Sequence, residues 1–383
     1  MSRVLMVSTD YPPIRGGISS LAFHLAGDLA RRGHDVEVVA PRWEGWEAQD
    51  QADPCRVWRT PGYNWGYLRG VPLVAGAARR LVVRPPDVIL PMNVAYGGLA
   101  MRLARALGCR IPYLMFAYGL EFARFRESPL MRRIYRQVYE QAERVFAVSA
   151  DTRSRLGEFG VQNRIEVLYP GVDTARFTPE GPDFRRLLAL ESRPVIGTLS
   201  RLVERKGFDT VLRAMPRVLE EFPDALYLVV GDGPDRPRLE AMVRDLGLGG
   251  SVHFAGSADE ESLAAWFRTL DVFVMPSREI PSSGHVEGFG IVFLEAGACG
   301  RPVIGGRSGG VVEAVQDGSS GVLVNPGDPE DLARALLAML RDPQRARHLG
   351  RSGRLRVERE FTWEKVLEPL GDFLETLHPR ESR

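Results

Sequence analysis

The sequence PSREIPSSGHVEGFGIVFLEAGACGRPVIGGRSGG, residues 276–310, combines a glycine-rich loop, a helix start and two carboxylates. Apolar runs at 272–275 and 302–304 flank its central part and predict strands. Between them, the apolar stretch 291–298 predicts a buried helix whose first turn is Gly-Phe-Gly, 288–290. Because glycines leave their amides unmasked, we expect this helix start to attract an anion.

Two carboxylates accompany this predicted anion site. Glu287 stands just before the helix start and Glu295 about one turn inside it. They would repel a lone phosphate, but carboxylates accept hydrogen bonds from ribose and hexose hydroxyls. The pattern therefore favours a nucleotide sugar, which presents hydroxyls on both sides of its phosphates. The alternative is that the glycines only form a turn and that Glu295 is a solvated helix residue.

Length and composition predict two globular domains. The chain has 383 residues, 44% of them hydrophobic and 26% charged, and this length suits two cores better than one. A net charge of +1 gives no reason to expect nucleic acid as a partner. The N-terminus predicts a strand and not a signal peptide, and no window of 18 apolar residues occurs. Three widely spaced cysteines favour reduced thiols and a cytoplasmic location.

The first half predicts alternating strands and helices. Gly16 and Gly17 follow a strand at 4–8 and precede a helix at 18–31, which is how a nucleotide-binding α/β unit begins. After a strand at 36–40, an aromatic-rich stretch at 43–67 predicts loops. Its aromatics would contact carbohydrate or lipid headgroups, or pack as a satellite of the core.

A ligand-facing strand end is predicted next. A strand at 87–91 and a helix at 94–107 lead to a strand at 111–116. The segment AYGLEF then puts Tyr118 and Glu121 just after the carboxyl end of that strand. Open α/β sheets bind ligands at such carboxyl ends. A helix at 124–144 follows, with arginines near aromatics, and would either rest on anionic lipid or form a solvated face. The residues concerned are Arg126, Arg132, Arg133, Arg136, Phe122, Phe125 and Tyr135.

The second half repeats this alternation. A Pro- and Gly-rich stretch near 178–190 predicts the linker. Domains are therefore predicted at 1–180, joined by a C-terminal amphipathic helix at 361–383, and at 190–360. Strands are predicted at 195–199, 225–231 and 252–255, and helices at 236–246 and 263–269.

Two cations stand at one turn of the second half. In SRLVERKGFDT, Arg201 ends a strand, and Lys206 starts a helix. Lys206 is one of only two lysines among 50 basic residues, which suggests a role for its compact ammonium. Two fixed cations and a helix end would stabilise a departing diphosphate. The sequence contains no D-x-D pair, so we expect no metal and no cofactor.

The chain resembles the retaining glycosyltransferases of family 4, in particular the phosphatidylinositol mannosyltransferase-like branch. The resemblance covers nearly the whole chain and rests on four segments. These are TDYPPIRGGISS, SRLVERKGFD, GDGPDRPRLE and EGFGIVFLEAGACGRPVIGGRSGGVVE. It implies an α/β protein of the GT-B fold, with two doubly wound Rossmann-like domains facing a central cleft and the donor bound mainly by the second. The C-terminal helix would cross back to the first domain.

Residue roles follow from matching positions. The resemblance implies that Arg201 and Lys206 hold the diphosphate and that Glu287 binds hydroxyls of the transferred sugar. Glu295 would bind the ribose. The other donor-side residues implied are Phe289, Gly290, Ile291, Gly17, Gly231, Gly233 and Gly256. The acceptor-side residues implied are Gly16, Asp10, Tyr118 and Glu121.

One position departs from the family pattern. Many relatives have a histidine where this chain has Tyr118, and a tyrosine is a poor proton acceptor at neutral pH. The resemblance implies front-face attack in which the departing phosphate takes the acceptor proton, so the departure bears on the choice of donor sugar more than on activity.

The resulting hypothesis is a metal-independent hexosyltransferase. It would use a GDP- or UDP-sugar, with mannose favoured and glucose or N-acetylglucosamine as alternatives, and a lipid-linked or glycan acceptor. We expect a cytoplasmic protein, or one at the inner face of the membrane with peripheral contact through 122–144. The alternatives are another GT-B enzyme, such as a nucleotide-sugar epimerase, and a nucleotide-sugar-binding protein without turnover.

Overall fold

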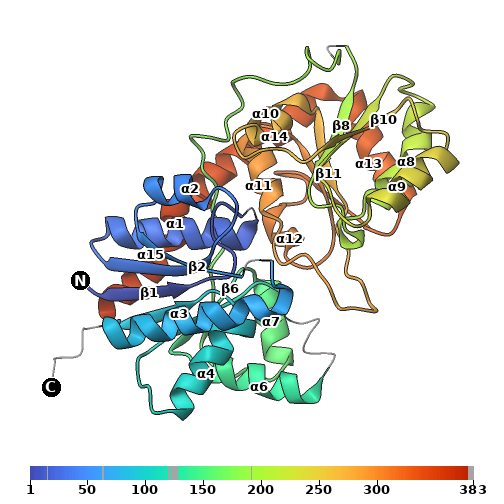
Figure 1. The fold of residues 1–383 in the computed structure, drawn as a ribbon. Helices are drawn as coiled ribbons and strands as arrows, with labels where there is room; N and C mark the ends of the chain where they lie inside the picture. Colours follow the sequence, from blue (N-terminus) through green and yellow to red (C-terminus); the bar gives the residue numbers. More distant parts are fainter. Residues whose placement is uncertain (15, 63, 120, 122–127, 191, 378–383) are drawn as a thin grey trace. The chain divides into compact units, whose positions relative to one another are not determined.

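The chain forms two compact units in a computed structural model that describes residues 1–14, 16–62, 64–119, 121, 128–190 and 192–377 (Figure 1). Unit 1 contains Met1–Gly171 and Trp363–Arg383, and unit 2 contains Val172–Thr362. Each end of the chain therefore belongs to unit 1. The turn-rich stretch 178–190 lies inside unit 2.

Unit 1 is built on parallel strands. They pair in the orders β3-β2-β1-β4 and β5-β6-β7, and a single parallel bridge between Ile89 and Tyr113 connects the two sheets. The strands are β1 (Arg3–Val7), β2 (Asp35–Pro41), β3 (Arg56–Thr60), β4 (Val88–Pro91), β5 (Leu114–Ala117), β6 (Arg144–Ala147) and β7 (Ile165–Val167). The helices are α1 (Gly17–Arg31), α2 (Trp46–Ala52), η1 (Gly66–Arg69), α3 (Gly70–Val83), η2 (Val94–Gly98), α4 (Leu99–Ala106), α6 (Pro129–Glu140), α7 (Ala150–Glu158) and α15 (Trp363–Thr376).

Two segments of unit 1 differ from the prediction. The stretch predicted as loops contains α2, β3 and η1, because Arg59 of β3 pairs with Asp50 of α2 at 2.7 Å and so fixes both elements. The helix predicted at 94–107 begins as a π-helical turn and becomes α-helical only at Leu99. Asn93 caps this turn by accepting from the amide of Tyr96 at 3.0 Å.

The C-terminal helix α15 packs on α1 within unit 1 (Figure 1). Arg32, just after α1, binds Asp372 at 3.1 Å and Glu375 at 3.4 Å. The guanidinium of Arg144 lies 3.6 Å from the centre of the Phe373 ring, a cation–π contact. These contacts attach the last helix to the end of α1 and to β6.

Unit 2 is a six-stranded parallel sheet with strand order β10-β9-β8-β11-β12-β13. The chain runs outward from β8 to β10 and then returns to the other side of β8, so the order reverses between β8 and β11. The strands are β8 (Val195–Leu199), β9 (Leu226–Val230), β10 (Val252–Gly256), β11 (Val272–Met275), β12 (Val303–Gly306) and β13 (Val322–Val324). The helices are η3 (Glu204–Lys206), α8 (Phe208–Leu219), α9 (Arg236–Asp245), α10 (Leu263–Thr269), α11 (Ile291–Ala298), α12 (Val311–Ala314), α13 (Pro329–Arg341) and α14 (Pro343–Glu360).

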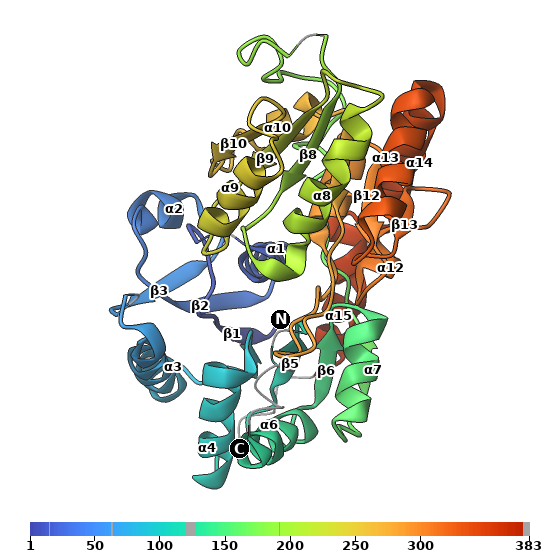
Figure 2. The same cartoon turned by 90° about the vertical axis from the view of Figure 1, so that its right-hand side faces the viewer.

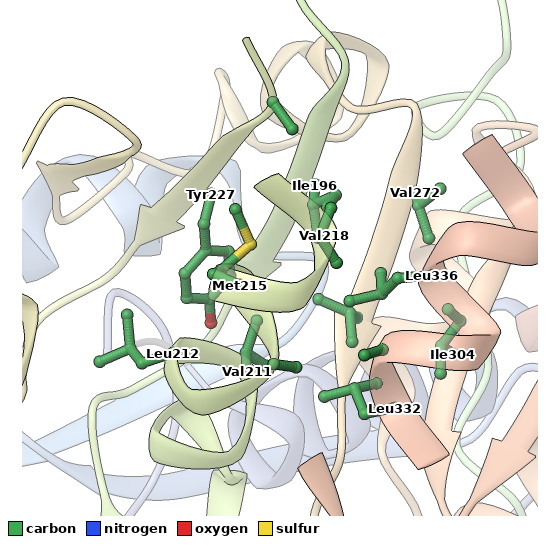
Figure 3. Close-up of a cluster of buried hydrophobic side chains, with 14 of the residues drawn as sticks. Ile196, Val211, Leu212, Met215, Val218, Tyr227, Val272, Ile304, Leu332 and Leu336 are labelled. Atoms are coloured by element: carbon green, nitrogen blue, oxygen red, sulfur yellow. The ribbon is translucent and has the colours of Figure 1, made fainter. Parts of the chain in front are cut away.

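The core of unit 2 lies under α8, α9 and α13, which cover one face of the sheet (Figure 2). Met215 and Val218 of α8 and Leu336 of α13 meet Tyr227 and Ile304 of the strands (Figure 3). Each of these side chains is fully buried, so the carboxyl ends of the strands are held by a packed layer. Within the described residues, no helix is long and apolar enough to cross a bilayer.

Candidate active site

The candidate site forms at the carboxyl ends of β8 and β11, where the strand order of unit 2 reverses. Open α/β sheets bind ligands at such a switch point, because the loops leaving the two strands diverge there. The loop after β8 carries Arg201, Arg205 and Lys206, and the loop after β11 carries Glu287. Gly207 allows the two loops to touch. It has φ of 77°, and a Cβ atom there would lie 2.2 Å from the carbonyl oxygen of Pro276.

Lys206, Arg205 and Glu287 form a nearly buried cluster. The Lys206 Nζ lies 2.6 Å from Glu287 Oε2, and the Arg205 Nη1 lies 2.5 Å from the same oxygen. Their side chains are only 8%, 20% and 12% exposed, in the order Lys206, Arg205 and Glu287. The structure therefore brings two of the predicted residues together and adds Arg205, which the prediction missed although it is adjacent to Lys206.

Electrostatics keep this cluster ionised. Burial alone would raise the pKa of Glu287, but Lys206 and Arg205 together hold that pKa below its ordinary value. Burial lowers the pKa of Lys206, and the Glu287 carboxylate opposes that shift. Two cations share one carboxylate, so the cluster carries a net positive charge.

Arg278 braces the loop that presents these cations. Its amide donates to the carbonyl of Arg205 at 2.8 Å, and its guanidinium binds Asp209 of α8 at 2.8 Å. Burial alone would raise the pKa of Asp209, but its hydrogen bonds and ion pairs with Arg278 and Arg213 lower it overall. Arg201 differs from the buried pair. Its side chain is exposed and makes no recorded ion pair with any described residue.

The start of α11 adjoins Glu287. Gly288–Gly290 was predicted as the first helical turn, but the helix begins only after these residues, at Ile291, because Gly290 adopts a left-handed conformation with φ of 88°. No side chain forms a capping hydrogen bond with the first amides of the helix. Phe289 is 3% exposed and packs on Phe361, with 5.9 Å between ring centres.

Gly310 fixes the backbone before that helix. Its amide donates to the carbonyl of Glu287 at 3.0 Å, and a Cβ atom at this position would lie 2.1 Å from the carbonyl oxygen of Gly288. The loop after β12 therefore supports the backbone that carries Glu287. A glycine is required there by this close approach.

Glu295 lies one turn inside α11, in an environment opposite to that of Glu287. Burial and the nearby Glu260 raise the pKa of Glu295 to about 7, and Arg176 and Lys206 only partly offset this. Arg176 is itself paired with Glu260. Near neutral pH the Glu295 side chain is thus divided between its protonated and ionised forms.

The predicted GDG turn packs on the loop after β8. A Cβ atom at Gly231 would lie 2.0 Å from the carbonyl oxygen of Ser200, and one at Gly233 would lie 2.3 Å from that of Leu202. Gly256, at the end of β10, accepts from the amide of Gly231 at 2.7 Å. Gly231 and Gly233 therefore border the loop that carries Arg201 and Lys206, and Gly256 holds Gly231.

The predicted acceptor-side residues lie in unit 1. Gly16 precedes α1 and Gly17 opens it, after the loop that contains Asp10. The main-chain carbonyl of Asp10 accepts from the Ser8 hydroxyl at 2.7 Å. These residues follow the carboxyl end of β1.

Tyr118 and Glu121 follow the carboxyl end of β5. Glu121 accepts from the amide of Tyr118 at 2.9 Å and from the hydroxyl of Tyr139 at 3.2 Å. Burial raises the pKa of Glu121, and burial together with Glu121 and Asp10 raises that of Tyr118. The Tyr118 hydroxyl is buried and has no hydrogen-bond partner in the described part of the chain. A hydroxyl in this state is available to a ligand but is not a base at neutral pH.

In the ranges that the structure describes, no group of three or more His, Cys, Asp or Glu side chains is placed to hold a metal ion.

Comparison with known proteins assigns both units to one class of enzyme. Residues 15–176 match the family described as Glycosyltransferase Family 4, and residues 181–356 match Glycosyl transferases group 1. The fold is shared with the sucrose-phosphate synthase of Thermosynechococcus elongatus (TM-score 0.83, 24% identity, 98% and 99% of the two chains). It is also shared with Anabaena HepE in complex with UDP (TM-score 0.81, 20% identity, 98% and 100% of the chains). These are GT-B structures, with two Rossmann-like domains.

The chain belongs to glycosyltransferase family 4, in its phosphatidylinositol mannosyltransferase-like branch, and is a hexosyltransferase. It is similar to a GDP-mannose-dependent α-(1-6)-phosphatidylinositol monomannoside mannosyltransferase of Mycolicibacterium smegmatis, with 38% identity over 92% of each chain. A protein of the same name from Mycobacterium tuberculosis is 36% identical over 98% of each chain. The prediction of family, fold class and enzyme type is confirmed.

The raised pKa of Glu295 predicts a pH-dependent stability. Its folded pKa of about 7 exceeds the ordinary value of 4.5, so the folded state binds this proton more tightly than the unfolded state. The protein should therefore lose stability, by up to about 3 kcal/mol, as the pH rises from 4.5 through 7. Glu295→Gln removes this loss, so urea unfolding should show the variant gaining stability over the parent at pH 8 relative to pH 5. The exposed Glu330→Gln is the control. An equal difference at both pH values would contradict the assignment.

Proposed function

We propose that this hexosyltransferase transfers mannose from GDP-mannose to a hydroxyl of a phosphatidylinositol-linked mannoside, with retention of the anomeric configuration. The observation that carries the proposal is the similarity to GDP-mannose-dependent mannosyltransferases along nearly the full length of both chains. The cluster at the switch point of unit 2 supplies the chemistry that such a donor requires, namely cations and bare amides beside two carboxylates.

In this proposal the diphosphate is held by Lys206 and Arg201. The buried Lys206 provides a fixed charge, and the exposed Arg201 is free of intramolecular ion pairs in the described chain, so it can move to the ligand. The amides of Phe289, Gly290 and Ile291, at the start of α11, lie beside sugar and phosphate. A helix N-terminus contributes a partial positive charge there, which favours the departing diphosphate.

The two carboxylates bind hydroxyls on either side of the diphosphate. Glu287 accepts from the transferred sugar and Glu295 from the ribose, since ionised carboxylates are strong acceptors. Gly231, Gly233 and Gly256 border the base of the nucleotide. The departing phosphate accepts the acceptor's proton, so no enzymic nucleophile takes part.

We propose that this chemistry needs no metal ion. Charge neutralisation by Lys206, Arg201 and the start of α11 takes the place of a divalent cation, and the sequence has no D-x-D pair to bind one. On the acceptor side, Asp10 and Gly16 receive the acceptor together with Tyr118 and Glu121. The unpartnered Tyr118 hydroxyl can donate a hydrogen bond to it.

Lipid contact is better supported at α3 than at the predicted segment 122–144. Residues 122–127 lie outside the described residues, and Tyr135 is 2% exposed, so it does not flank the arginines at the surface as predicted. Outward-facing Val71, Ala75, Ala78 and Val82 form an apolar stripe along α3, with Val71 66% and Val82 82% exposed.

Charge around α3 favours an anionic surface. Residues 54–86 contain six arginines and no acidic residue. Of these arginines, Arg59, Arg80 and Arg84 pair with Asp50, Glu37 and Asp35, whereas Arg56 and Arg79 are exposed. An exposed apolar stripe with cations near it suits a membrane interface that contains anionic lipid. We propose that α3 rests on such a surface and brings unit 1 to its lipid acceptor.

The proposed function predicts transfer without a divalent ion. Radiolabelled GDP-mannose should give a mannosylated product with phosphatidylinositol mannoside as acceptor, at equal rates with and without EDTA. UDP-glucose and UDP-N-acetylglucosamine should be used at least about tenfold less well, because a mismatched base leaves buried polar groups unpaired. Equal use of a uridine donor would contradict the assignment of GDP-mannose, and inhibition by EDTA would contradict metal independence.

Lys206→Ala should lower kcat/KM for the donor about 10- to 150-fold, because it removes a charge-assisted contact of roughly 1.5–3 kcal/mol. Lys365→Ala is a matched control, since Lys365 is the other lysine of the chain and lies exposed on α15. Steady-state assays at varied GDP-mannose measure both. If Lys206→Ala turned over donor as fast as the parent, its role at the diphosphate would be wrong.

Negative charges introduced on the apolar stripe of α3 should weaken binding of the protein to membranes. The double variant Val71→Glu and Val82→Glu places two anions in the apolar stripe, so binding to vesicles containing phosphatidylinositol should fall at least about tenfold. Leu355→Glu, on an equally exposed site of unit 2, should leave vesicle binding unchanged. Flotation assays measure the protein bound to vesicles. Unaltered flotation of the double variant would contradict the assignment of α3 as the membrane-binding helix.

A further inference from the structure

The two buried cations at the switch point of unit 2 are paired with one of the protein's own carboxylates. Lys206 at 2.6 Å and Arg205 at 2.5 Å both bind Glu287 Oε2. Within the described residues, the other oxygen, Oε1, makes no recorded hydrogen bond or ion pair. Glu287 therefore binds both cations through one oxygen, Oε2.

An incoming diphosphate must compete with Glu287 for the same cations. All three side chains are at most 20% exposed, so the contacts are little screened by water, and a charge left without a partner there is costly. When phosphate oxygens bind Lys206, the carboxylate of Glu287 loses that ion pair and lies beside a second anion. That arrangement is repulsive unless Glu287 finds hydrogen-bond donors.

Sugar hydroxyls are such donors, and a free diphosphate has none to offer. With a nucleotide sugar, the released Glu287 exchanges its ion pairs for hydrogen bonds from the hexose. With the product nucleoside diphosphate, the hexose is gone and the carboxylate faces phosphate alone. The same cluster thus responds differently to substrate and product.

We propose that Glu287 is an internal competitor for the diphosphate, holding Lys206 and Arg205 in the free enzyme, yielding them to a sugar-bearing nucleotide and reclaiming them to expel the product. This rests on the proposed function, in which Lys206 binds the donor's diphosphate. Glu287 then gives the site its preference for donor over product, beyond its contact with the sugar.

The inference predicts that removing one negative charge strengthens binding of diphosphate. Isothermal titration should show that Glu287→Gln binds inorganic pyrophosphate and GDP about 10- to 100-fold more tightly than the parent, because the intramolecular competitor is gone. The ratio of GDP-mannose to GDP affinity should fall in the same variant. Glu204→Gln, on the same turn and with an exposed side chain, changes the net charge equally and should alter each affinity less than twofold. Pyrophosphate binding by Glu287→Gln that is equal to or weaker than the parent's would overturn the inference.

Two further arms keep the test decisive. If circular dichroism shows that Glu287→Gln does not fold, Glu287→Asp replaces it, since a side chain one methylene shorter cannot reach both cations, and it must still bind pyrophosphate more tightly than the parent. The GDP-mannose arm tests the donor separately. A parent that binds pyrophosphate but not GDP-mannose would contradict the proposed function while leaving the competition at Glu287 to be decided by the pyrophosphate result.

Discussion

The ion pair between Lys206 and Glu287 is the contact on which the site depends. It joins two residues that are 81 positions apart in the chain and whose loops meet because β8 and β11 are neighbours in the sheet. The two loops approach closely because Gly207 has no side chain to clash with the backbone of Pro276. Arg278 then anchors the cationic loop to α8 through Asp209. A parallel sheet alone would place these loops nearby, but it is this bracing that fixes atoms within hydrogen-bond distance.

Helix α11 is held at both ends, which sets the position of Glu295. Gly290 starts it in a left-handed turn, and at its far end Arg354 donates to the carbonyl of Ala298 at 2.9 Å. A cation at the carboxyl end of a helix is favourable, because it complements the helix dipole. The helix also approaches α14 closely, where a Cβ atom at Gly297 would lie 3.6 Å from the backbone of Gly353. The helix is thus held against α14, with Glu295 one turn after its start.

The sequence predicted those strands and helices that coincide with a continuous apolar run. Strands β8 and β11 and helix α10 have the predicted bounds, and α11 ends where predicted, because buried parallel strands and helices are continuously apolar. It failed where tertiary contacts decide the structure, as in β3, where Asp50 binds Arg59. It also assigned no elements to 311–360. In the site, Lys206 stood out by its rarity, whereas Arg205 is one arginine among many. Only the coordinates reveal which arginine lies against Glu287.

Two glutamates of one motif acquire opposite properties from their surroundings. Glu287 lies between two cations that lower its pKa, and it stays ionised over the whole physiological range. Glu295, eight residues later, is buried near Glu260, and its pKa rises to about 7. Environments that separate the pKa values of paired carboxylates assign them different tasks. A permanent anion can compete for cations and then accept from a sugar, whereas a carboxyl near its midpoint can either donate or accept. Ribose hydroxyls do both, so in the proposed function Glu295 would bind them without a full second negative charge beside the diphosphate.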